Sequence, residues 1–220
     1  MQRLAIYFCP APGALADAAA QWLGRDVATG AVLPQPHPML PGLTVAPRRY
    51  GFHATLKAPF RLAAGHGEAT LLEGVRVLAR ALRPVAIEGL APRRLGGFLA
   101  LMPGGDTKAL DALAAQVVTG LDRFRAPLTE AEIARRNPSA LAPRQRALLA
   151  QWGYPHVLDT FRFHMTLTDR LTEAQAAALL PLARAHFAPA LADPVMLDAL
   201  CILGEDAAGV FHLRHRVPLG

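Results

Sequence analysis

Apolar and polar residues alternate along two short stretches of the chain, and each stretch has a histidine and a threonine at its polar positions. In the segment FHATL these are His53 and Thr55, and in the segment FHMTL they are His164 and Thr166. Because successive side chains of a strand point to opposite faces, each segment predicts a strand with one apolar face and one face that carries the two polar side chains. We expect these two motif strands at about residues 50–58 and 161–168.

The other hydrophobic runs are either short and rich in β-branched and aromatic residues, which indicates strands, or rich in alanine, which indicates helices. Gly24, Asp106 and Thr172 stand where helix caps are expected, and Pro59 is expected to end the first motif strand. Residues 28–47 are rich in Pro and Gly and predict a loop. The expected strands are 3–9, 85–89, 97–102, 196–203 and 210–217, and the expected helices are 13–24, 68–82, 106–124 and 172–186.

The order strand, helix, strand, strand occurs around each motif and suggests an internal duplication. We therefore predict an α+β fold in which residues 1–220 form a single bilobal domain. Two pseudo-symmetric lobes, each an antiparallel sheet backed by helices, would enclose an active cleft lined by the motif strands. Residues 127–155 depart from this order and predict two short charged helices, which could form an insertion or a cover over the site.

The charge of the chain narrows the class of ligand. A formal net charge of +6, carried almost wholly by arginine, should attract anions and favours phosphorylated or nucleotide substrates. The basic residues are scattered and form no long run of the kind found in nucleic-acid-binding arms. Charge therefore does not separate a small phosphate ester from RNA.

Cysteine use and hydropathy indicate the compartment. Cys9 and Cys201 are the only cysteines, and their spacing matches no disulfide framework. The first residues lead into Pro and Gly without a secretory cleavage pattern. No run of 18 or more apolar residues is present. We expect a protein of the reducing cytoplasm without a membrane partner.

Motifs for common cofactors are missing from the sequence. It contains no GxxxxGK[ST], GxGxxG or CxxC segment, so ATP, dinucleotide and structural zinc sites lack support. His212 and His215 lie three apart on an expected strand, face opposite sides and cannot easily share a metal. We expect neither a cofactor nor a metal.

The repeated motif supplies groups that chemistry at a phosphate needs. Two copies of His-x-Thr-Leu among eight histidines would arise by chance with a probability of about 0.002. With an ordinary pKa of about 6.5, His53 and His164 can serve as one base and one acid near neutral pH. Thr55 and Thr166 can donate hydrogen bonds to the non-bridging oxygens of a phosphate.

Three further residues are candidates for substrate binding. In the expected alternation Lys57 and Arg162 share a face with the motif histidines and could balance phosphate charge. Tyr7 could stack on a base or a sugar, although a packed aromatic is the simpler interpretation. In the structural alternative the histidines are hydrogen-bonded core residues, the threonines are ordinary strand residues and the two cations are surface charges.

At these residues the chain resembles the 2H phosphoesterase superfamily, which is marked by two H-Φ-[ST]-Φ motifs in one bilobal chain. The longer strings RRYGFHATLKAPFRL and WGYPHVLDTFRFHMTLTDRL are most similar to the branch found with bacterial phosphonate-metabolism (carbon–phosphorus lyase) operons. The resemblance implies a metal-independent cyclic phosphodiesterase in which His53 and His164 are the paired acid and base and Thr55 and Thr166 hold the phosphate. The substrate it implies is a small phosphoribosyl cyclic phosphate.

Two other functions stay open. One is an RNA 2′,3′-cyclic or 2′–5′ phosphodiesterase that processes RNA ends, which would need a continuous basic track and exposed stacking aromatics. The low aromatic content and the cover at 127–155 favour a small molecule over RNA. The other is a non-enzymatic nucleotide- or phosphate-binding regulator, which would not require paired proton carriers.

Overall fold

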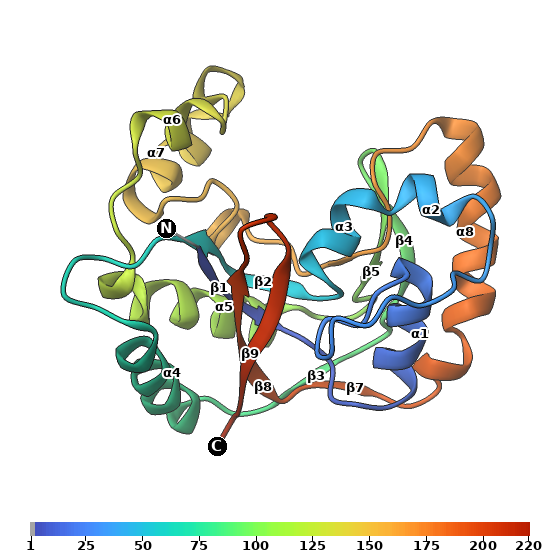
Figure 1. Cartoon of the computed structure of the whole chain (residues 1–220), viewed down its shortest axis with the longest axis horizontal. Helices are drawn as coiled ribbons and strands as arrows, with labels where there is room; N and C mark the ends of the chain where they lie inside the picture. Colours follow the sequence, from blue (N-terminus) through green and yellow to red (C-terminus); the bar gives the residue numbers. More distant parts are fainter. Residues whose placement is uncertain (1–2) are drawn as a thin grey trace.

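An antiparallel sheet organises the protein. The computed structural model describes residues 3–220, and in it seven strands follow the order β4-β5-β6-β2-β1-β8-β9 (Figure 1). Strands β3 (Val85–Ile87) and β7 (Val195–Leu197) form a separate antiparallel pair. The strands of the large sheet are β1 (Leu4–Phe8), β2 (Ala54–Phe60), β4 (Ala91–Leu95), β5 (Phe98–Met102), β6 (Met165–Thr166), β8 (Ala199–Glu205) and β9 (Phe211–Pro218).

Helices back this sheet and bury apolar side chains against it. Leu71 of α4, Val117 of α5 and Leu179 of α8 are fully buried in the same core cluster as the apolar faces of the motif strands. The predicted α+β class, with antiparallel sheets backed by helices, is confirmed. The helices are α1 (Ala14–Leu23), α2 (Leu40–Leu43), α3 (Val45–Tyr50), α4 (Glu68–Ala81), α5 (Lys108–Gly120), α6 (Glu130–Ala134), α7 (Pro143–Trp152) and α8 (Glu173–Phe187), with 3₁₀ turns η1 (Asp122–Phe124), η2 (Pro138–Ala140), η3 (Leu158–Thr160) and η4 (Pro189–Leu191).

Local sequence signals place several helix ends. The hydroxyl of Thr172 accepts a hydrogen bond from the Gln175 amide at 3.2 Å, and the Gln175 side chain returns one to the Thr172 amide at 2.9 Å, so α8 begins at a capping box. Helix α1 ends at Gly24 in the left-handed conformation, as expected. The predicted cap of α5 is displaced by one residue, because Thr107 occupies the cap position and the Asp106 carboxylate accepts from the Lys108 amide instead.

The element order repeats around the two motifs. The first runs β2-α4-β3-β4-β5 and the second runs β6-α8-β7-β8-β9. The two copies interlock, because the β4–β5 hairpin of the first pairs with β6 of the second, and β3 pairs with β7. Consequently the sheet is continuous, and the two motif strands are direct neighbours within it instead of facing each other from separate sheets.

The sequence prediction differs from the structure at the first motif and at strand β4. Residues 40–50 form the short helices α2 and α3 instead of a loop and the start of a strand, and β2 begins only after Gly51, whose φ is 75°. Pro59 lies inside β2, where the pairing with β1 is irregular and a missing amide hydrogen is tolerated. Strand β4 was not expected, because its sequence APRRL carries a proline and two exposed arginines, which suit an edge strand.

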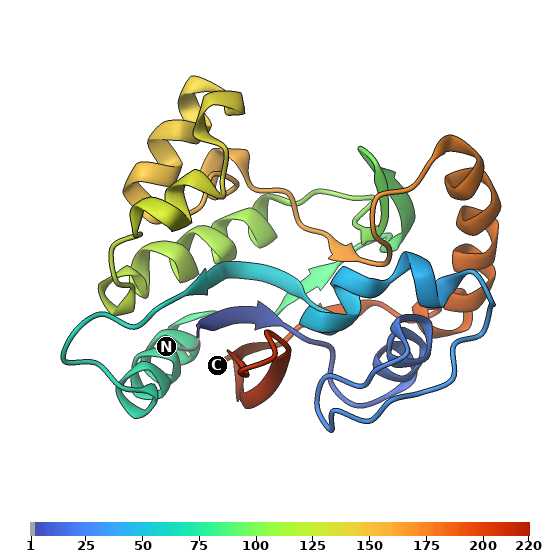
Figure 2. The ribbon, with the colours of Figure 1, turned by 45° about the horizontal axis from the view of Figure 1, so that its top comes forward.

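Residues 127–155, which we call the arm, contain α6 and α7 as the two expected short helices. They stand out on the opposite side of the molecule from α8 (Figures 1 and 2). Within residues 3–220, none of the helices combines the length and the apolar character needed to cross a lipid bilayer. Cys9 and Cys201 are both buried free thiols.

Candidate active site

The pairing of the two motif strands gathers the motif side chains. Ala54 and Met165, the middle residues of the two motifs, are antiparallel cross-strand partners. This register places each histidine across from the threonine of the other motif, on one face of the sheet. The Cβ atoms of such facing residues lie about 4.5–5.5 Å apart. The side chains of His53, Thr55, His164 and Thr166 all line one cleft of about 520 Å³.

Both imidazoles are held by the same backbone device. The Nδ1 atom of His53 is 2.8 Å from the carbonyl oxygen of Gly51, and the Nδ1 atom of His164 is 2.8 Å from the carbonyl oxygen of Arg162. Because a carbonyl oxygen only accepts, each Nδ1 carries a proton, and the neutral ring keeps its lone pair on Nε2. The Nε2 atom of His53 lies 3.2 Å from the hydroxyl of Thr55. The repeated sequence motif therefore gives both histidines the same hydrogen bond to the main chain.

The His53 ring is enclosed. It stacks on the ring of Tyr7 with a centroid distance of 3.7 Å and an interplanar angle of 15°. Burial lowers the pKa of His53 to about 4, against the opposing effect of the hydrogen bond to Gly51, and the charge of His164 adds to the lowering. His53 is therefore neutral at pH 7 and can accept a proton. The influence of His164 also indicates that the two rings lie close enough to interact.

The His164 ring has looser surroundings. Its aromatic neighbour is Phe98, at a centroid distance of 5.9 Å and a tilt of 52°. Burial also lowers the pKa of His164, and the hydrogen bond to the Arg162 carbonyl opposes this effect. Both histidines are thus biased toward the neutral form, with the larger effect at His53.

Tyr7 lies beneath His53. Its ring is almost wholly buried and one face of it is covered by the imidazole, so the packed-aromatic interpretation holds for the ring. Burial raises the pKa of Tyr7 well above its ordinary value, which keeps the hydroxyl protonated. Tyr7 also borders the cleft. The Tyr7 ring thus packs against the imidazole of His53 and shields that side of it from water.

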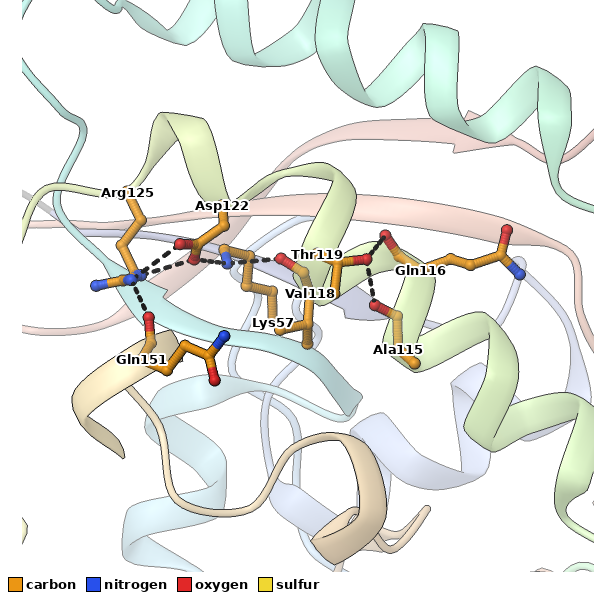
Figure 3. A network of polar contacts seen from close by, with 8 residues as sticks. All are labelled: Lys57, Ala115, Gln116, Val118, Thr119, Asp122, Arg125 and Gln151. Atoms are coloured by element: carbon orange, nitrogen blue, oxygen red, sulfur yellow. Dashed lines mark hydrogen bonds and ion pairs between the residues drawn. The ribbon is translucent and has the colours of Figure 1, made fainter. Parts of the chain in front are cut away.

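The expectation that Lys57 faces the site is wrong. Strand β1 pairs Tyr7 with Thr55 but Ile6 with Lys57, so the register shifts by one residue after Thr55 and the alternation of faces reverses. Ala58 lines the cleft instead. The Lys57 ammonium is buried on the helix side, 2.8 Å from the Asp122 carboxylate and 3.1 Å from the Val118 carbonyl (Figure 3).

Arg162 is not among the residues that line the cleft. Its side chain is exposed, and its contribution to the site is the main-chain carbonyl that holds His164. Five other arginines line the cleft in the part of the chain that the structure describes, and none of them was among the predicted site residues. Two of them are the neighbouring arginines at the end of the segment EAEIARR, within the predicted cover. Two arginines side by side in a segment expected to cover the site were a sequence signal for anion binding. The five arginines are Arg3, Arg49, Arg135, Arg136 and Arg170.

The two acidic residues that border the cleft, Glu132 and Asp169, form hydrogen bonds with groups other than the cleft arginines. Glu132 accepts hydrogen bonds from Arg61, at 3.0 Å from its Nη2 atom. Asp169 accepts the backbone amides of Val45 and Ala46 at 2.8 and 3.0 Å. The cleft therefore has an excess of positive charge that attracts anions. Within residues 3–220, no three His, Cys, Asp or Glu side chains are grouped so that they could hold a metal ion.

Two curated proteins are similar to this chain. "Ribose 1,5-bisphosphate phosphokinase PhnN" of Janthinobacterium sp. (strain Marseille) is 43% identical over 99% of the chain, and the protein of the same name from Laribacter hongkongensis (strain HLHK9) is 36% identical over 94%. The matches cover 51% and 49% of these relatives, so the chain spans about half of their length. Their names agree with the resemblance to phosphonate-associated proteins.

A solved structure and a family also match. The structure, "Crystal structure of phosphoesterase", aligns with 100% of this chain and 99% of its own, with 15% identity and a TM-score of 0.41. The family "Protein of unknown function (DUF1045)" matches residues 55–212, which include all of the second motif and Thr55 of the first. Because this match spans well over half of the sequence, the chain belongs to the DUF1045 family.

Proposed function

We propose that the protein is a phosphodiesterase that opens a cyclic phosphate by metal-independent acid/base catalysis with two histidines. The observation that carries this proposal is the pairing of Ala54 with Met165, which gathers two imidazoles and two hydroxyls on one face of the sheet in a positively charged cleft. A purely structural pair of histidines would not need to line a shared cleft with two hydroxyls.

In the proposed reaction His53 is the base and His164 is the acid. Nε2 of His53 takes a proton from a water molecule whose oxygen forms a bond to phosphorus. Nε2 of His164 donates a proton to the ring oxygen as the bond from that oxygen to phosphorus breaks, and a phosphate monoester results. Thr55 and Thr166 donate hydrogen bonds to the non-bridging oxygens.

The surroundings of the two rings support this assignment. The form of the enzyme that reacts has a neutral base and a protonated acid, and it is most populated when the base has the lower pKa. The pKa of His53 is about 4, whereas His164 is less strongly affected. A bound phosphate would raise the pKa of the nearby His164 through its negative charge and would favour the protonated acid.

The aromatic rings that border the cleft favour a small substrate over RNA. The ring of Tyr50 packs on Phe211 at a centroid distance of 5.1 Å, and the guanidinium of Arg49 lies 5.1 Å above it. The guanidinium of Arg136 lies 4.9 Å above Tyr154. These rings are occupied by protein groups, so they are poorly placed to stack on bases.

The relatives fit a phosphorylated ribose as substrate. Their name refers to ribose 1,5-bisphosphate, and we favour a phosphonate-derived phosphoribosyl cyclic phosphate here. The name also says phosphokinase, but this chain matches only about half of those proteins and has no GxxxxGK[ST] segment. We therefore propose a hydrolase reaction for the chain and no kinase reaction.

A turnover screen tests the proposal. Ribose 1,2-cyclic phosphate, nucleoside 2′,3′-cyclic phosphates and 2′–5′-linked RNA are incubated with the protein with and without EDTA. We expect monoester formation from the ribose compound, unchanged by EDTA and lost in His53→Ala and His164→Ala. Arg162→Gln, a change of an exposed side chain outside the cleft, is the control and should keep full activity. Strict dependence on a metal, or binding without turnover, would contradict the proposal.

A further inference from the structure

The arm contributes a second wall to the cleft. Arg135, Arg136 and Tyr154 of the arm border the same space as the motif histidines of the sheet. Cavities of about 300–1,000 Å³ take whole small ligands, and the volume of about 520 Å³ lies in that range. A ligand whose phosphate lies at the histidines therefore has room to extend toward the arm.

Two arginines of this wall lack an acidic partner. Arg135 and Arg136 form no ion pair with any residue from 3 to 220, whereas Arg61, Arg125 and Arg144 each do. The guanidinium of Arg136 is held over the ring of Tyr154, which fixes it without using its N–H groups. Two guanidinium groups that line the same cleft and keep their donors free fit a phosphate.

The neighbouring carboxylate, Glu132, does not pair with these arginines. Glu132 lies one helical turn before them, where it could pair with either at spacing i,i+3 or i,i+4. Its oxygens instead accept from Arg61 and from the Thr129 amide at 2.8 Å, and the bonds from Arg61 are the main reason that its pKa falls to about 2. The positive charge on the cleft side is therefore not neutralised.

The arm is fixed with respect to the catalytic strand. Arg61, which follows β2 directly, donates to the Pro127 carbonyl at 2.7 Å as well as to Glu132. Arg125 donates to the Gln151 carbonyl at 2.9 Å and to the carboxylate of Asp122, which also holds Lys57 of β2 (Figure 3). These bonds tie the arm to β2, the strand that carries Thr55.

We propose that Arg135 and Arg136 form a subsite for a second phosphate of the substrate, so that the enzyme prefers a cyclic phosphate that carries an additional phosphomonoester. This inference rests on the proposed function for its reacting end. The histidines and threonines act on the cyclic phosphate, and the two arginines bind the distant monoester and orient the molecule.

A matched pair of substrates tests the subsite. Ribose 1,2-cyclic phosphate is compared with its 5-phosphorylated form, in the wild type and in the double variant Arg135→Gln/Arg136→Gln. We expect the wild type to prefer the phosphorylated form in kcat/KM by about 10- to 100-fold, since each charged hydrogen-bonding group contributes about tenfold or more. The double variant should lose this preference, because its kcat/KM should fall far more for the phosphorylated form than for the plain form.

Arg144→Gln/Arg146→Gln is the control, because it removes the same charge from the arm outside the catalytic cleft. It should keep the preference. Arg136→Lys should lie between wild type and the double variant, since a lysine keeps the charge but not the planar fork. A wild type without preference, or an equal loss on both substrates in the double variant, would overturn the subsite.

Equilibrium binding separates failure of the subsite from failure of the proposed reaction. Ribose 5-phosphate, which has the monoester but no cyclic phosphate, is titrated into the wild type, the double arginine variant and His53→Ala/His164→Ala. We expect binding that weakens by at least about tenfold in the arginine variant and persists in the histidine variant. If no cyclic phosphate is turned over but this pattern holds, the subsite stands and the reaction fails. Binding that ignores the arginines overturns the subsite.

Discussion

The two motif strands carry the same chemical groups in different surroundings. Strand β2 is seven residues long, and His53 just before it stacks on Tyr7. Strand β6 has two residues, and the aromatic neighbour of His164 just before it is a tilted Phe98. The shared groups are held alike, by a carbonyl two residues upstream at 2.8 Å in both copies. The repeat thus supplies two equivalent parts, and the packing around them lowers the pKa of His53 more strongly than that of His164.

The same contrast continues four residues after each histidine. Lys57 is buried in an ion pair with Asp122, whereas Thr168 is buried with its hydroxyl accepting the Leu99 amide at 3.0 Å. The first copy therefore connects β2 to α5 and to the arm through charged groups. The second copy connects β6 to the neighbouring strand β5 through a neutral hydrogen bond. The two copies should respond differently to equivalent substitutions.

The largest expected effect is the loss of either histidine. His53→Ala and His164→Ala should each lower kcat by about 10²- to 10⁴-fold, because each removes one proton transfer. A phosphodiester with a nitrophenolate leaving group needs no acid, so it should restore much of the activity of His164→Ala and little of that of His53→Ala. Steady-state kinetics on both substrates checks this. If the nitrophenyl substrate restores the activity of both variants equally, the assignment of His53 as base and His164 as acid is wrong.

The next effect is on stability and concerns Lys57 and its partner. Asp122→Asn leaves a buried ammonium without its counter-charge and should lower the free energy of unfolding by about 3–5 kcal/mol. Lys57→Met removes the charge as well and leaves Asp122 with Arg125, so it should cost less than about 1.5 kcal/mol. Thr168→Val in the second copy should cost about 1–3 kcal/mol. Urea unfolding of the three variants measures this order.

The pH dependence of the unfolding free energy tests the ion pair between Lys57 and Asp122 independently. Burial acts to raise the pKa of Asp122, but the bonds from Arg125 and Lys57 outweigh it and hold the pKa below 3.8. A carboxylate with a lowered pKa contributes stability above its ordinary pKa and loses it as the pH falls through the folded-state value. The gap between wild type and Asp122→Asn should therefore shrink below about pH 4. A gap that stays constant down to pH 2 would contradict the ion pair.

These differences also mark what could be predicted from the sequence. The alternation in FHATL and FHMTL is local, so the two strands and the residues that share their apolar faces could be predicted. The side on which Lys57 lies depends on a register shift against β1, fifty residues away, and no local pattern encodes it. Likewise the stacking of Tyr7 on His53 and the position of Arg135 and Arg136 at the cleft depend on tertiary packing.

A smaller effect distinguishes the two threonines. Thr55→Ala and Thr166→Ala should each lower kcat/KM by about 10- to 100-fold, the loss of one hydrogen bond to a charged group. Thr55 also contacts Nε2 of His53 at 3.2 Å, whereas the Thr166 hydroxyl forms no hydrogen bond with His164 or with any other side chain among residues 3–220. Only Thr55→Ala should therefore alter the pH profile as well. Thr55→Ser and Thr166→Ser keep the hydroxyl and should keep most of the activity.

The smallest effect concerns the pKa of His53 and the ring beneath it. The acid limb of kcat/KM reports the base of the free enzyme, so it should lie near pH 4 in the wild type, because protonated His53 cannot accept a proton. Tyr7→Leu removes a ring that shields His53 from water, so the pKa should rise toward its ordinary value and the limb should move up by about one pH unit. Tyr7→Phe keeps the ring and should leave the limb in place, which separates shielding from the hydroxyl. If the limb of Tyr7→Leu stays where the wild type has it, stacking does not set the pKa of His53, and the two copies lose the feature that distinguishes base from acid.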